Sequence, residues 1–461
     1  MFPAADTIVA LSTPPGRSAI GVIRLSGSRS LEIARLLVRD DSFRPKPTSV
    51  VLRNIYDPVT DDCLDQALIT YFEAPHSFTG EDVIEISCHG SPVLLRSVMD
   101  IILRHDARAA DPGEFTLRAL AHGRMNLTQA EAVRDLIDAQ TNAAVKQASR
   151  QLHGEVSHVL QPVKEMLLEV IVRLESTIEF VEDDLPPIEH GKLAATLRRL
   201  QRTLQQLAAT FQQGRLLSGG VKAVLLGRPN VGKSSVFNSL LAHERAIVTE
   251  LPGTTRDTLT ESIDISGIPV LLTDTAGLRS AKDRIESIGV ERARRAAADA
   301  DIAILVIDGA DELTPEDYNL LDESRDEAYV IALNKKDLPS FHSQRLEEKF
   351  PALTNGRPIV AVSAKTNEGL DDLRTAILKS LTQDGGGFAE GLIITNARHY
   401  DLLTRAMDAI GSAENLFLER ASEDLVLVGL HSALSYLAQI LGETTTDDIL
   451  AEIFSTFCIG K

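Results

Sequence analysis

The sequence is short of cysteine, has no tryptophan and contains no long apolar run. Its three cysteines, Cys63, Cys88 and Cys458, are odd in number and far apart. This excludes a disulfide framework and a cysteine-based metal site, and it favours a reducing compartment. The chain has no stretch of about 18 uninterrupted apolar residues, and its amino terminus lacks the basic start and apolar run of a signal peptide. These absences predict a cytoplasmic protein without a membrane span.

Basic residues are also in deficit. Lysine and arginine number 47 against 66 aspartates and glutamates, which gives a formal net charge of -19. Such a balance argues against sequence-independent binding of nucleic acid through a broadly basic surface, and it leaves room only for a local basic patch. The length of 461 residues is enough for about three domains.

The first segment, residues 1–120, mixes short β-like runs with helical ones. This alternation predicts an α/β or α+β domain of its own. The strands are expected at 7–11, 20–25, 67–72 and 83–88, and the helices at 31–38 and 93–104.

The second segment, residues 121–217, has a helical pattern. Apolar residues recur at the helical period from 145 to 181, which predicts one long helix with a buried stripe and a kink at Pro162. A second apolar series, from Leu193 to Phe211, predicts a helix that returns antiparallel to the first.

The third segment, residues 218–381, alternates strands and helices, and the fourth, residues 382–461, is helical again. The alternation predicts a mostly parallel sheet covered on both faces. The strand-like runs lie at 221–226, 260–266, 269–274, 302–307, 329–333 and 359–362. Because helical arms flank the third segment, we expect them to pack as one bundle into which that segment is inserted.

The most informative stretch is the strand, loop and helix that begin at Val221. Residues 227–234 read Gly-Arg-Pro-Asn-Val-Gly-Lys-Ser, the spacing of a phosphate-binding loop, in which backbone N–H groups and a helix terminus face the phosphates. Lys233 would reach the β- and γ-phosphates, and the Ser234 hydroxyl would bind magnesium. The competing interpretation is an ordinary glycine-rich turn, but the flanking strand and helix favour nucleotide binding.

Further motifs follow at the ends of the predicted strands. Asp274-Thr275-Ala276-Gly277 can hold the magnesium shell and offer an N–H to the γ-phosphate. Asn334-Lys335-Lys336-Asp337 places a carboxylate where it can accept two hydrogen bonds from guanine, a donor pair that adenine lacks. Ser363-Ala364-Lys365 would close the base pocket, and Thr255 would add a second hydroxyl to magnesium in a mobile switch. The order of these motifs predicts a Ras-like GTPase domain.

These motifs and their flanks resemble the MnmE family of tRNA modification GTPases, also called TrmE, over the whole chain. The resemblance is carried by residues 227–235, 246–249, 253–257 and 274–279, by the terminal Cys458-Ile459-Gly460-Lys461, and by residues 21–27, 77–82 and 112–116. It implies an N-terminal α/β folate-binding-like domain that also dimerises, a helical bundle domain and an inserted Ras-like P-loop GTPase domain. The residues expected to bind GTP are then Asn230, Val231, Gly232, Lys233, Ser234, Ser235, Thr249, Thr254, Thr255, Asp274, Thr275, Ala276, Gly277, Asn334, Lys335, Asp337, Ser363, Ala364 and Lys365.

The hydrolysis machinery departs from that of Ras. Leu278 stands where Ras-type enzymes carry a water-orienting glutamine, and leucine has no hydrogen-bonding side-chain atom. The resemblance implies that a potassium ion takes the place of an arginine finger. The loop that holds the ion would become ordered when two GTPase domains dimerise. The implied ligands of the ion are Asn230, Thr249, Leu251 and Thr254.

The resemblance also implies that Glu286 positions the attacking water. From the residues alone, Glu286 is a solvated acid on a helix, and Arg256 and Arg279 are surface or salt-bridged arginines that could also act as fingers in cis.

For the first domain the resemblance implies a site for 5-formyltetrahydrofolate or 5,10-methylenetetrahydrofolate. Its contacts would be Arg24, Glu81 and Arg124, with Lys461 reaching the same site from the helical domain. Arginines can pair a folate carboxylate, although each of these charges taken alone is an ordinary surface residue. Cys458 is a candidate nucleophile, with a packed small hydrophobe as the competing interpretation.

Two functions from different classes remain. The first is an enzyme that binds GTP and folate and, with the flavin-dependent partner MnmG (GidA), installs a carboxymethylaminomethyl-type group on C5 of the wobble uridine of tRNA. The second is a regulatory or ribosome-assembly GTPase, which commonly appends an RNA-binding unit such as a KH module. No such module is recognisable after residue 381, which favours the enzyme. Folate binding by residues 1–120 would separate the two.

Overall fold

The computed structural model describes residues 6–179, 190–243, 260–274, 298–323, 329–342, 357–382 and 391–460. Its internal contacts divide the chain into two compact units. Unit 1 consists of Met1–Arg134, Gln151–Ile171 and His431–Lys461, and unit 2 of Asp135–Arg150 and Val172–Leu430. Each unit therefore contains segments that are distant in the sequence, and each builds one six-stranded sheet with helices packed on it. The predicted fold class, α/β domains combined with a helical part, is confirmed.

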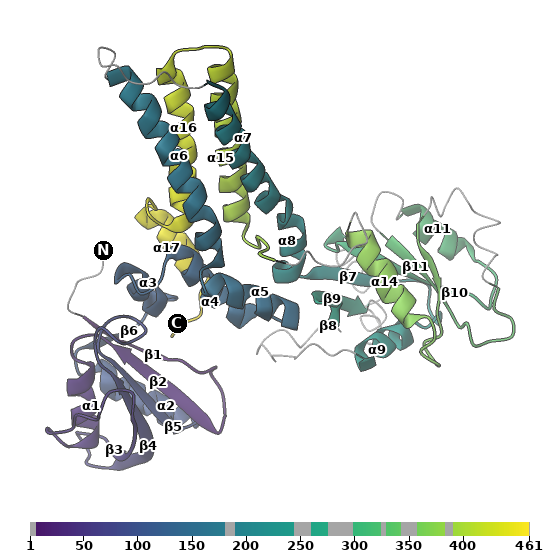
Figure 1. Ribbon diagram of the computed structural model, residues 1–461. Coiled ribbons are helices and arrows are strands. Elements are labelled where there is room, and N and C mark those ends of the chain that lie inside the picture. Colours follow the sequence, from purple (N-terminus) through teal and green to yellow (C-terminus); the bar gives the residue numbers. More distant parts are fainter. Residues whose placement is uncertain are drawn as a thin grey trace. The chain divides into compact units, whose positions relative to one another are not determined.

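The sheet of unit 1 has the strand order β3-β4-β5-β2-β1-β6 (Figure 1). Neighbouring strands are antiparallel except for β1 and β6, which are parallel. The strands are β1 (Thr7–Leu11), β2 (Ile20–Ser26), β3 (Val50–Tyr56), β4 (Cys63–Phe72), β5 (Val83–His89) and β6 (Ala107–Ala109). The four strands predicted for this region are present, whereas β3 and β6 were not predicted.

Two helices, α1 (Ser30–Val38) and α2 (Pro92–Leu103), cover one face of this sheet. Their apolar sides form one core with the inward side chains of the strands, such as Ile23 and Leu25 of β2. Because side chains alternate along a strand, the even-numbered residues of β2 point to the opposite face. There α3 (Glu114–Ala121) packs Phe115 against Ile8 and Ala10 of β1.

The carboxyl end of the chain packs into unit 1. α17 (Asp447–Ser455) and the residues after it contribute Phe454 and Phe457 to a cluster with Leu127 and Ala130 of α4 (Leu127–Asp138). The Arg134 guanidinium also donates to the Thr456 hydroxyl at 2.8 Å. These contacts bring the last residues of the chain next to its first domain.

The sheet of unit 2 has the order β12-β11-β10-β7-β9-β8. All neighbours are parallel except β8 and β9, which form an antiparallel hairpin at one edge. The strands are β7 (Val221–Leu226), β8 (Thr260–Ile265), β9 (Ile268–Asp274), β10 (Ile302–Asp308), β11 (Tyr329–Asn334) and β12 (Ile359–Ala361).

Helices cover both faces of this sheet, as predicted. α9 (Lys233–His243) and α14 (Leu370–Leu381) pack on one face, and α11 (Pro315–Glu323) contributes Leu321 to the core of the other. β10 and β11 have no exposed residue, and their sequences are apolar up to the last residue because both faces of the sheet are buried there.

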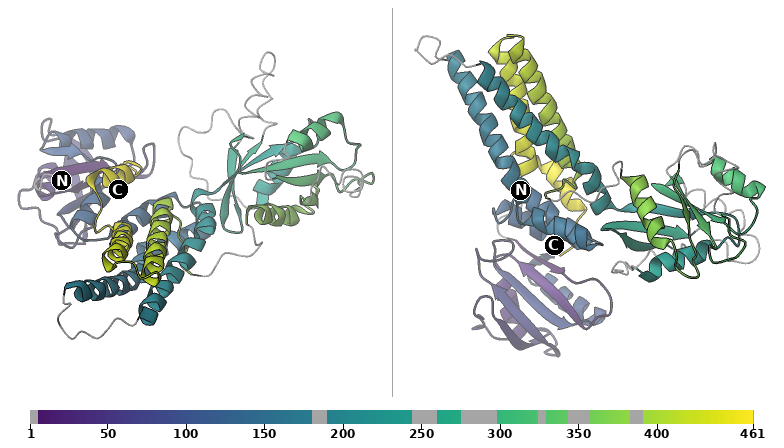
Figure 2. Two further views of the ribbon diagram at one scale, coloured as in Figure 1. Left: turned by 90° about the horizontal axis from the view of Figure 1, so that it is seen from above. Right: turned by 45° about the vertical axis from the view of Figure 1, so that its right-hand side comes forward.

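The helical part of unit 2 joins segments from before and after this sheet. α7 (His190–Ala209) packs along α15 (Ala397–Leu418) (Figure 2), and Arg198 forms an ion pair of 2.6 Å with Glu414 across the two helices. α8 (Phe211–Gly219) then leads into β7. The predicted bundle into which the GTPase segment is inserted therefore exists, while the predicted limits of the domains stay predictions.

One helix prediction was wrong. The apolar series from 145 to 181 does not form a single helix but two, α5 (Asn142–Leu152) and α6 (Glu155–Glu179). Gly154 has φ of +84°, a left-handed conformation that ends helices and that glycine adopts without steric cost. The helical spacing of apolar residues continues across Gly154 because α5 and α6 each bury one side.

α16 (Glu423–Leu441) is the one helix within the described ranges that is long and apolar enough to cross a membrane by length and composition, with a mean hydropathy of 1.4. Of that window, 44% is buried against protein, and buried core helices meet the same criterion.

Candidate functional site

The predicted phosphate loop connects β7 to α9, and its backbone requires two of its glycines. Gly227 and Gly232 have φ of +151° and +96°. A Cβ atom at Gly227 would lie 2.3 Å from the carbonyl oxygen of Val306, and one at Gly232 would lie 2.3 Å from Nδ2 of Asn334. No side chain fits at such distances, so the loop closes tightly only with glycine at both positions.

Lys233 is the first residue of α9, and its side chain folds back over the loop. Its Nζ donates to the carbonyl oxygens of Gly227 at 2.8 Å and Arg228 at 2.9 Å, and the residue is only 6% exposed. The loop carbonyls therefore hold a buried ammonium group where the motif places the phosphates. A positive charge held in this way can bind a β- or γ-phosphate with little reorganisation.

The two residues predicted to serve magnesium meet at the carboxyl ends of neighbouring strands. Leu225 of β7 lies opposite Asp274 of β9, so that the loop after β7 starts beside Asp274. The Ser234 hydroxyl donates to Oδ2 of Asp274 at 2.7 Å, and Asp274 is completely buried. A hydroxyl and a carboxylate are hard oxygen donors of the kind magnesium prefers, so this pair fits the ion.

The predicted base-binding residues form a second group beside the loop. Nδ2 of Asn334 donates to the Val231 carbonyl at 2.9 Å, and its Oδ1 accepts from the Ala364 N–H at 3.1 Å. The Ser363 hydroxyl donates to Oδ1 of Asp337 at 2.7 Å. Asn334 thus links the phosphate loop to the base loop, and Ser363 orients the carboxylate that would recognise guanine.

The remaining predicted GTP-binding residues divide into three groups. Lys335 forms a 2.6 Å ion pair with Asp308. Val231 is buried, while Asn230, Ser235 and Lys365 are exposed. The predicted residues outside the described ranges are Thr249, Leu251, Thr254, Thr255, Thr275, Ala276, Gly277, Glu286 and Lys461.

Arg228 of the phosphate loop was not predicted to have a role. Its guanidinium lies 3.0 Å from Asp311 and 3.4 Å from Asp317, a buried residue that caps the start of α11 through Thr314. The hydrogen bond from Arg228 lowers the pKa of the Asp311 carboxyl. Arg228 thus ties the phosphate loop to the loop after β10.

Of the predicted folate residues, Arg24 of β2 lies on the sheet face of unit 1 opposite α1 and α2. Arg24 and Glu85 are directly opposite each other on β2 and β5, and their side chains pair at 2.7 Å. Arg24 also donates to the carbonyl oxygen of Gly460 at 3.3 Å. The structure therefore brings the carboxyl end of the chain to Arg24, while it gives the arginine a carboxylate partner that sequence reasoning missed.

Glu81 lies near this pair, in the loop between β4 and β5. Its carboxylate accepts from the Ser26 hydroxyl at 2.7 Å and from Nη1 of Arg118, which lies 3.1 Å from each oxygen. Ser26 shares the face of Arg24, two residues away, which the period of a strand could have indicated. Arg118 comes from α3, and nothing local in the sequence connects it with Glu81.

The other two candidates of unit 1 are accessible. Arg124 is exposed, and its Cγ lies 3.5 Å from the position of a Cβ atom at Gly80, next to Glu81. Cys458 is exposed, and its carbonyl oxygen accepts from the Gly113 N–H at 3.4 Å. The competing interpretation of Cys458 as a packed hydrophobe is therefore wrong.

The other cysteine of interest, Cys88, is buried. Burial, followed by the Asp65 charge, raises the pKa of its thiol to about 12. The neighbouring His89 pairs with Asp65 at 2.7 Å and is 76% exposed. A histidine and carboxylate are thus present, but the adjacent thiol stays protonated and cannot act as a nucleophile.

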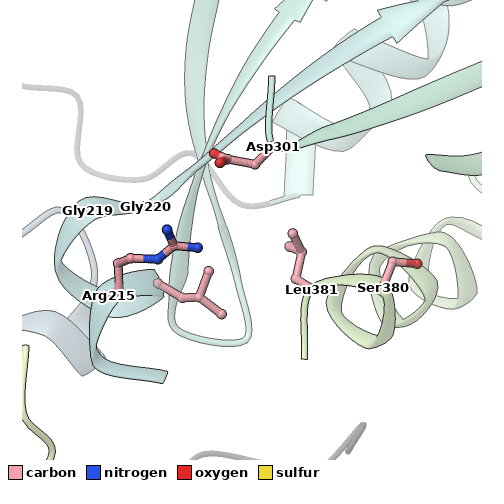
Figure 3. Close-up of a pocket in the computed structure, with 7 residues that line it drawn as sticks. Arg215, Gly219, Gly220, Asp301, Ser380 and Leu381 are labelled. Atoms are coloured by element: carbon pink, nitrogen blue, oxygen red, sulfur yellow. The ribbon is translucent and has the colours of Figure 1, made fainter. Parts of the chain in front are cut away.

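A cavity of about 410 Å³ lies in unit 2 (Figure 3). Gly220 directly precedes β7 and Asp301 directly precedes β10, so the cavity is at the amino ends of these parallel strands. The phosphate loop follows the carboxyl end of β7, at the opposite edge of the sheet. The cavity is lined by Arg215, Leu216, Gly219, Gly220, Asp301, Ser380 and Leu381, none of which belongs to a nucleotide motif.

The sequence matches known proteins along nearly its whole length. A family model described as the MnmE helical domain matches residues 127–458, and one described as the GTP-binding protein TrmE N-terminus matches residues 7–124. Two similar proteins, from Koribacter versatilis (strain Ellin345) and Aquifex aeolicus (strain VF5), are both described as tRNA modification GTPase MnmE. The first is 42% identical over 461 residues, covering 99% of each chain. The second is 41% identical over 458 residues, covering 99% of this chain and 100% of its own.

Proposed function

This chain belongs to the MnmE family of tRNA modification GTPases, and from that premise we propose that it is a cytoplasmic, potassium-activated GTPase of tRNA modification. With a flavin-dependent MnmG-type partner it would place a carboxymethylaminomethyl-type group on C5 of the wobble uridine. The one-carbon unit would come from 5-formyltetrahydrofolate or 5,10-methylenetetrahydrofolate.

The observation that supports GTP binding most strongly is the link made by Asn334. Its amide joins the loop that would hold the phosphates to the loop that would hold the base, through bonds of 2.9 and 3.1 Å. Lys233 supplies positive charge at the phosphate end, and Asp337 supplies an acceptor pair at the guanine end. Magnesium, held by Ser234 and Thr255, would neutralise phosphate charge when bound.

Potassium is proposed because the chain lacks a water-orienting glutamine. Leu278 cannot take that part, so Glu286 would position the water and a monovalent cation would offset the developing charge. Asn230 supports this proposal. It is exposed on the phosphate loop, and its amide oxygen is a donor atom of the kind that a monovalent cation binds. The other proposed ligands, Thr249, Leu251 and Thr254, lie outside the described residues.

Folate binding is proposed at a site formed by Arg24, Glu81 and Arg124. The pterin ring offers an N–H beside an amino group, the same donor pair that guanine offers to Asp337. A carboxylate such as Glu81 can accept both hydrogen bonds. Arg124 is free on the surface to pair a folate carboxylate, and Cys458 and Lys461 would reach this site from the end of the chain.

A homodimer is proposed through the part of the same sheet that nothing in the described portion of unit 1 covers. Leu52, Leu68 and Val22 stand in one row across β3, β4 and β2, with Ser87 of β5 between the last two. Leu52 and Leu68 are 50% and 43% exposed, and Ile20 nearby is 58% exposed. Such an apolar strip beside a polar site is suited to an interface with a second copy.

The experiment that tests the proposal measures GTP hydrolysis by the full chain in potassium and in sodium. We expect faster hydrolysis in potassium for the wild type, and equal, slow rates in both salts for Asn230→Ala. Equal rates in the two salts for the wild type would contradict potassium activation. A titration with 5-formyltetrahydrofolate separates the enzyme from a regulatory GTPase, because only the enzyme is expected to bind it.

A further inference from the structure

The carboxylate of Glu81 is held from two sides by buried residues. On one side the Ser26 hydroxyl, which is completely buried, donates to Oε2 at 2.7 Å. On the other side Nη1 of Arg118 lies 3.1 Å from both oxygens. Glu81 itself keeps 22% of its side chain exposed. One edge of the carboxylate is therefore fixed by the protein, and the rest faces solvent.

Arg118 is anchored independently of Glu81. Its side chain is 4% exposed, and its Nη2 donates to Asp6 at 2.7 Å and to Glu114 at 2.9 Å. Glu114 is in turn held by Arg108 at 2.5 Å and by the Asp111 N–H at 2.9 Å. Because Asp6 and Glu114 hold the Arg118 guanidinium in place, Arg118 orients the Glu81 carboxylate, and Glu81 is not needed to orient Arg118.

The ion pairs around Arg118 are already neutral without Glu81. Arg108 and Arg118 carry two positive charges, and Asp6 and Glu114 carry two negative ones, so these four groups balance. Glu81 adds a negative charge that the cluster does not need for neutrality. A partly exposed carboxylate with surplus charge and a fixed orientation is suited to a ligand that offers N–H donors.

We propose that Arg118 and Ser26 are positioning residues that fix the Glu81 carboxylate for the N–H and amino groups of a pterin. The inference rests on the proposed folate site and deepens it. Neither residue touches the ligand, because both are buried beneath Glu81. Ser26 lies on β2, on the same sheet face as Arg24. Arg118 comes from α3 and contacts the Glu81 carboxylate from another direction than Ser26. The ligand then meets a carboxylate whose rotation is already restricted, which lowers the entropy cost of binding.

The test is a double-mutant cycle on full-length protein, with the Kd for 5-formyltetrahydrofolate measured by calorimetry. Arg118→Lys keeps the charge but loses the two-oxygen contact, and Ser26→Ala removes the second hydrogen bond. Each is expected to raise the Kd about tenfold, the effect of one hydrogen bond to a charged group. In the Glu81→Ala background, which removes the acceptor oxygens, neither substitution should change the Kd further, because residues that act only through Glu81 lose their effect with it.

The matched control is Arg108→Lys. Arg108 contacts the same Asp6 and Glu114 as Arg118 but forms no hydrogen bond or ion pair with Glu81, so its substitution should change the Kd much less than Arg118→Lys does. Ser26→Ala serves if Arg118→Lys fails to fold, since it leaves the ion cluster intact; melting curves decide this. Unchanged affinity in both variants, or losses that persist in the Glu81→Ala background, would overturn the inference alone. A wild type that does not bind the folate would overturn the proposed site and this inference with it.

Discussion

The substitution Asn334→Ala tests whether one amide holds the nucleotide site together. Asn334 is 3% exposed, and its side chain makes one bond to the phosphate loop and one to the base loop. Alanine leaves the Val231 carbonyl and the Ala364 N–H without this partner. Each such loss costs about 1–3 kcal/mol, or about 2–6 kcal/mol for both. If about half of this free energy is lost from the GDP-bound protein relative to the free protein, the affinity for GDP decreases about 5- to 150-fold.

The assay is a titration with a fluorescent GDP analogue. Asn334→Asp keeps an acceptor for the Ala364 N–H but places a carboxylate oxygen against the Val231 carbonyl, so its affinity should fall at least as far as that of Asn334→Ala. Asn238→Ala is the matched control, because Asn238 is exposed on α9. The reasoning is refuted if folded Asn334→Ala binds GDP as tightly as the wild type, since the two loops would then hold their positions without the amide.

Three further predictions concern other groups. Asp337→Asn should shift the preferred base from guanine to xanthine, because the amide donates where the carboxylate accepted; unchanged GTP affinity would contradict this. Iodoacetamide should modify native Cys63 and Cys458, which are exposed, but not Cys88, whose buried thiol has a pKa of about 12; rapid labelling of a third thiol would argue against the burial. Burial works to raise the pKa of Glu114, but hydrogen bonds from its arginines and a backbone N–H outweigh it and hold the pKa below the ordinary 4.5. Its contribution to stability is therefore complete above about pH 4.5 and lost as the pH falls through the lower folded value. The free energy of unfolding, measured with urea between pH 3 and 6, should decrease toward low pH and should decrease less steeply in Glu114→Gln. An equal pH dependence in both proteins would contradict this prediction.

The pattern of the sequence was sufficient for much of the fold and for the nucleotide motifs. Strands β10 and β11 of unit 2 are nearly continuous apolar runs, and parallel strands place their carboxyl ends at one edge. Ser234 and Asp274 could therefore be expected to meet, and they do at 2.7 Å. The same reasoning joined two helices at Gly154, because the apolar period carries no information about a single left-handed residue.

The site in unit 1 was predictable only in part. Arg24 and Glu81 were assigned through the resemblance, but neither the pairing of Arg24 with Glu85 nor the contact of Glu81 with Arg118 was foreseen. The cross-strand pair depends on the register of β2 and β5, which is set by the packing of their inward side chains. The contact of Arg118 with Glu81 depends on how α3 packs on the sheet.

The sequence by itself determined that the chain carries a phosphate loop and its partner motifs, because these are short segments whose chemistry depends on local spacing. Only the tertiary structure decided which charges balance each other around Glu81 and that the chain end meets Arg24 through the Gly460 carbonyl, where the resemblance had implied only that Lys461 reaches the same site. Those contacts join residues 37 and 436 positions apart. Their partners are chosen by burial and by the docking of α3 and α17, which no local pattern encodes.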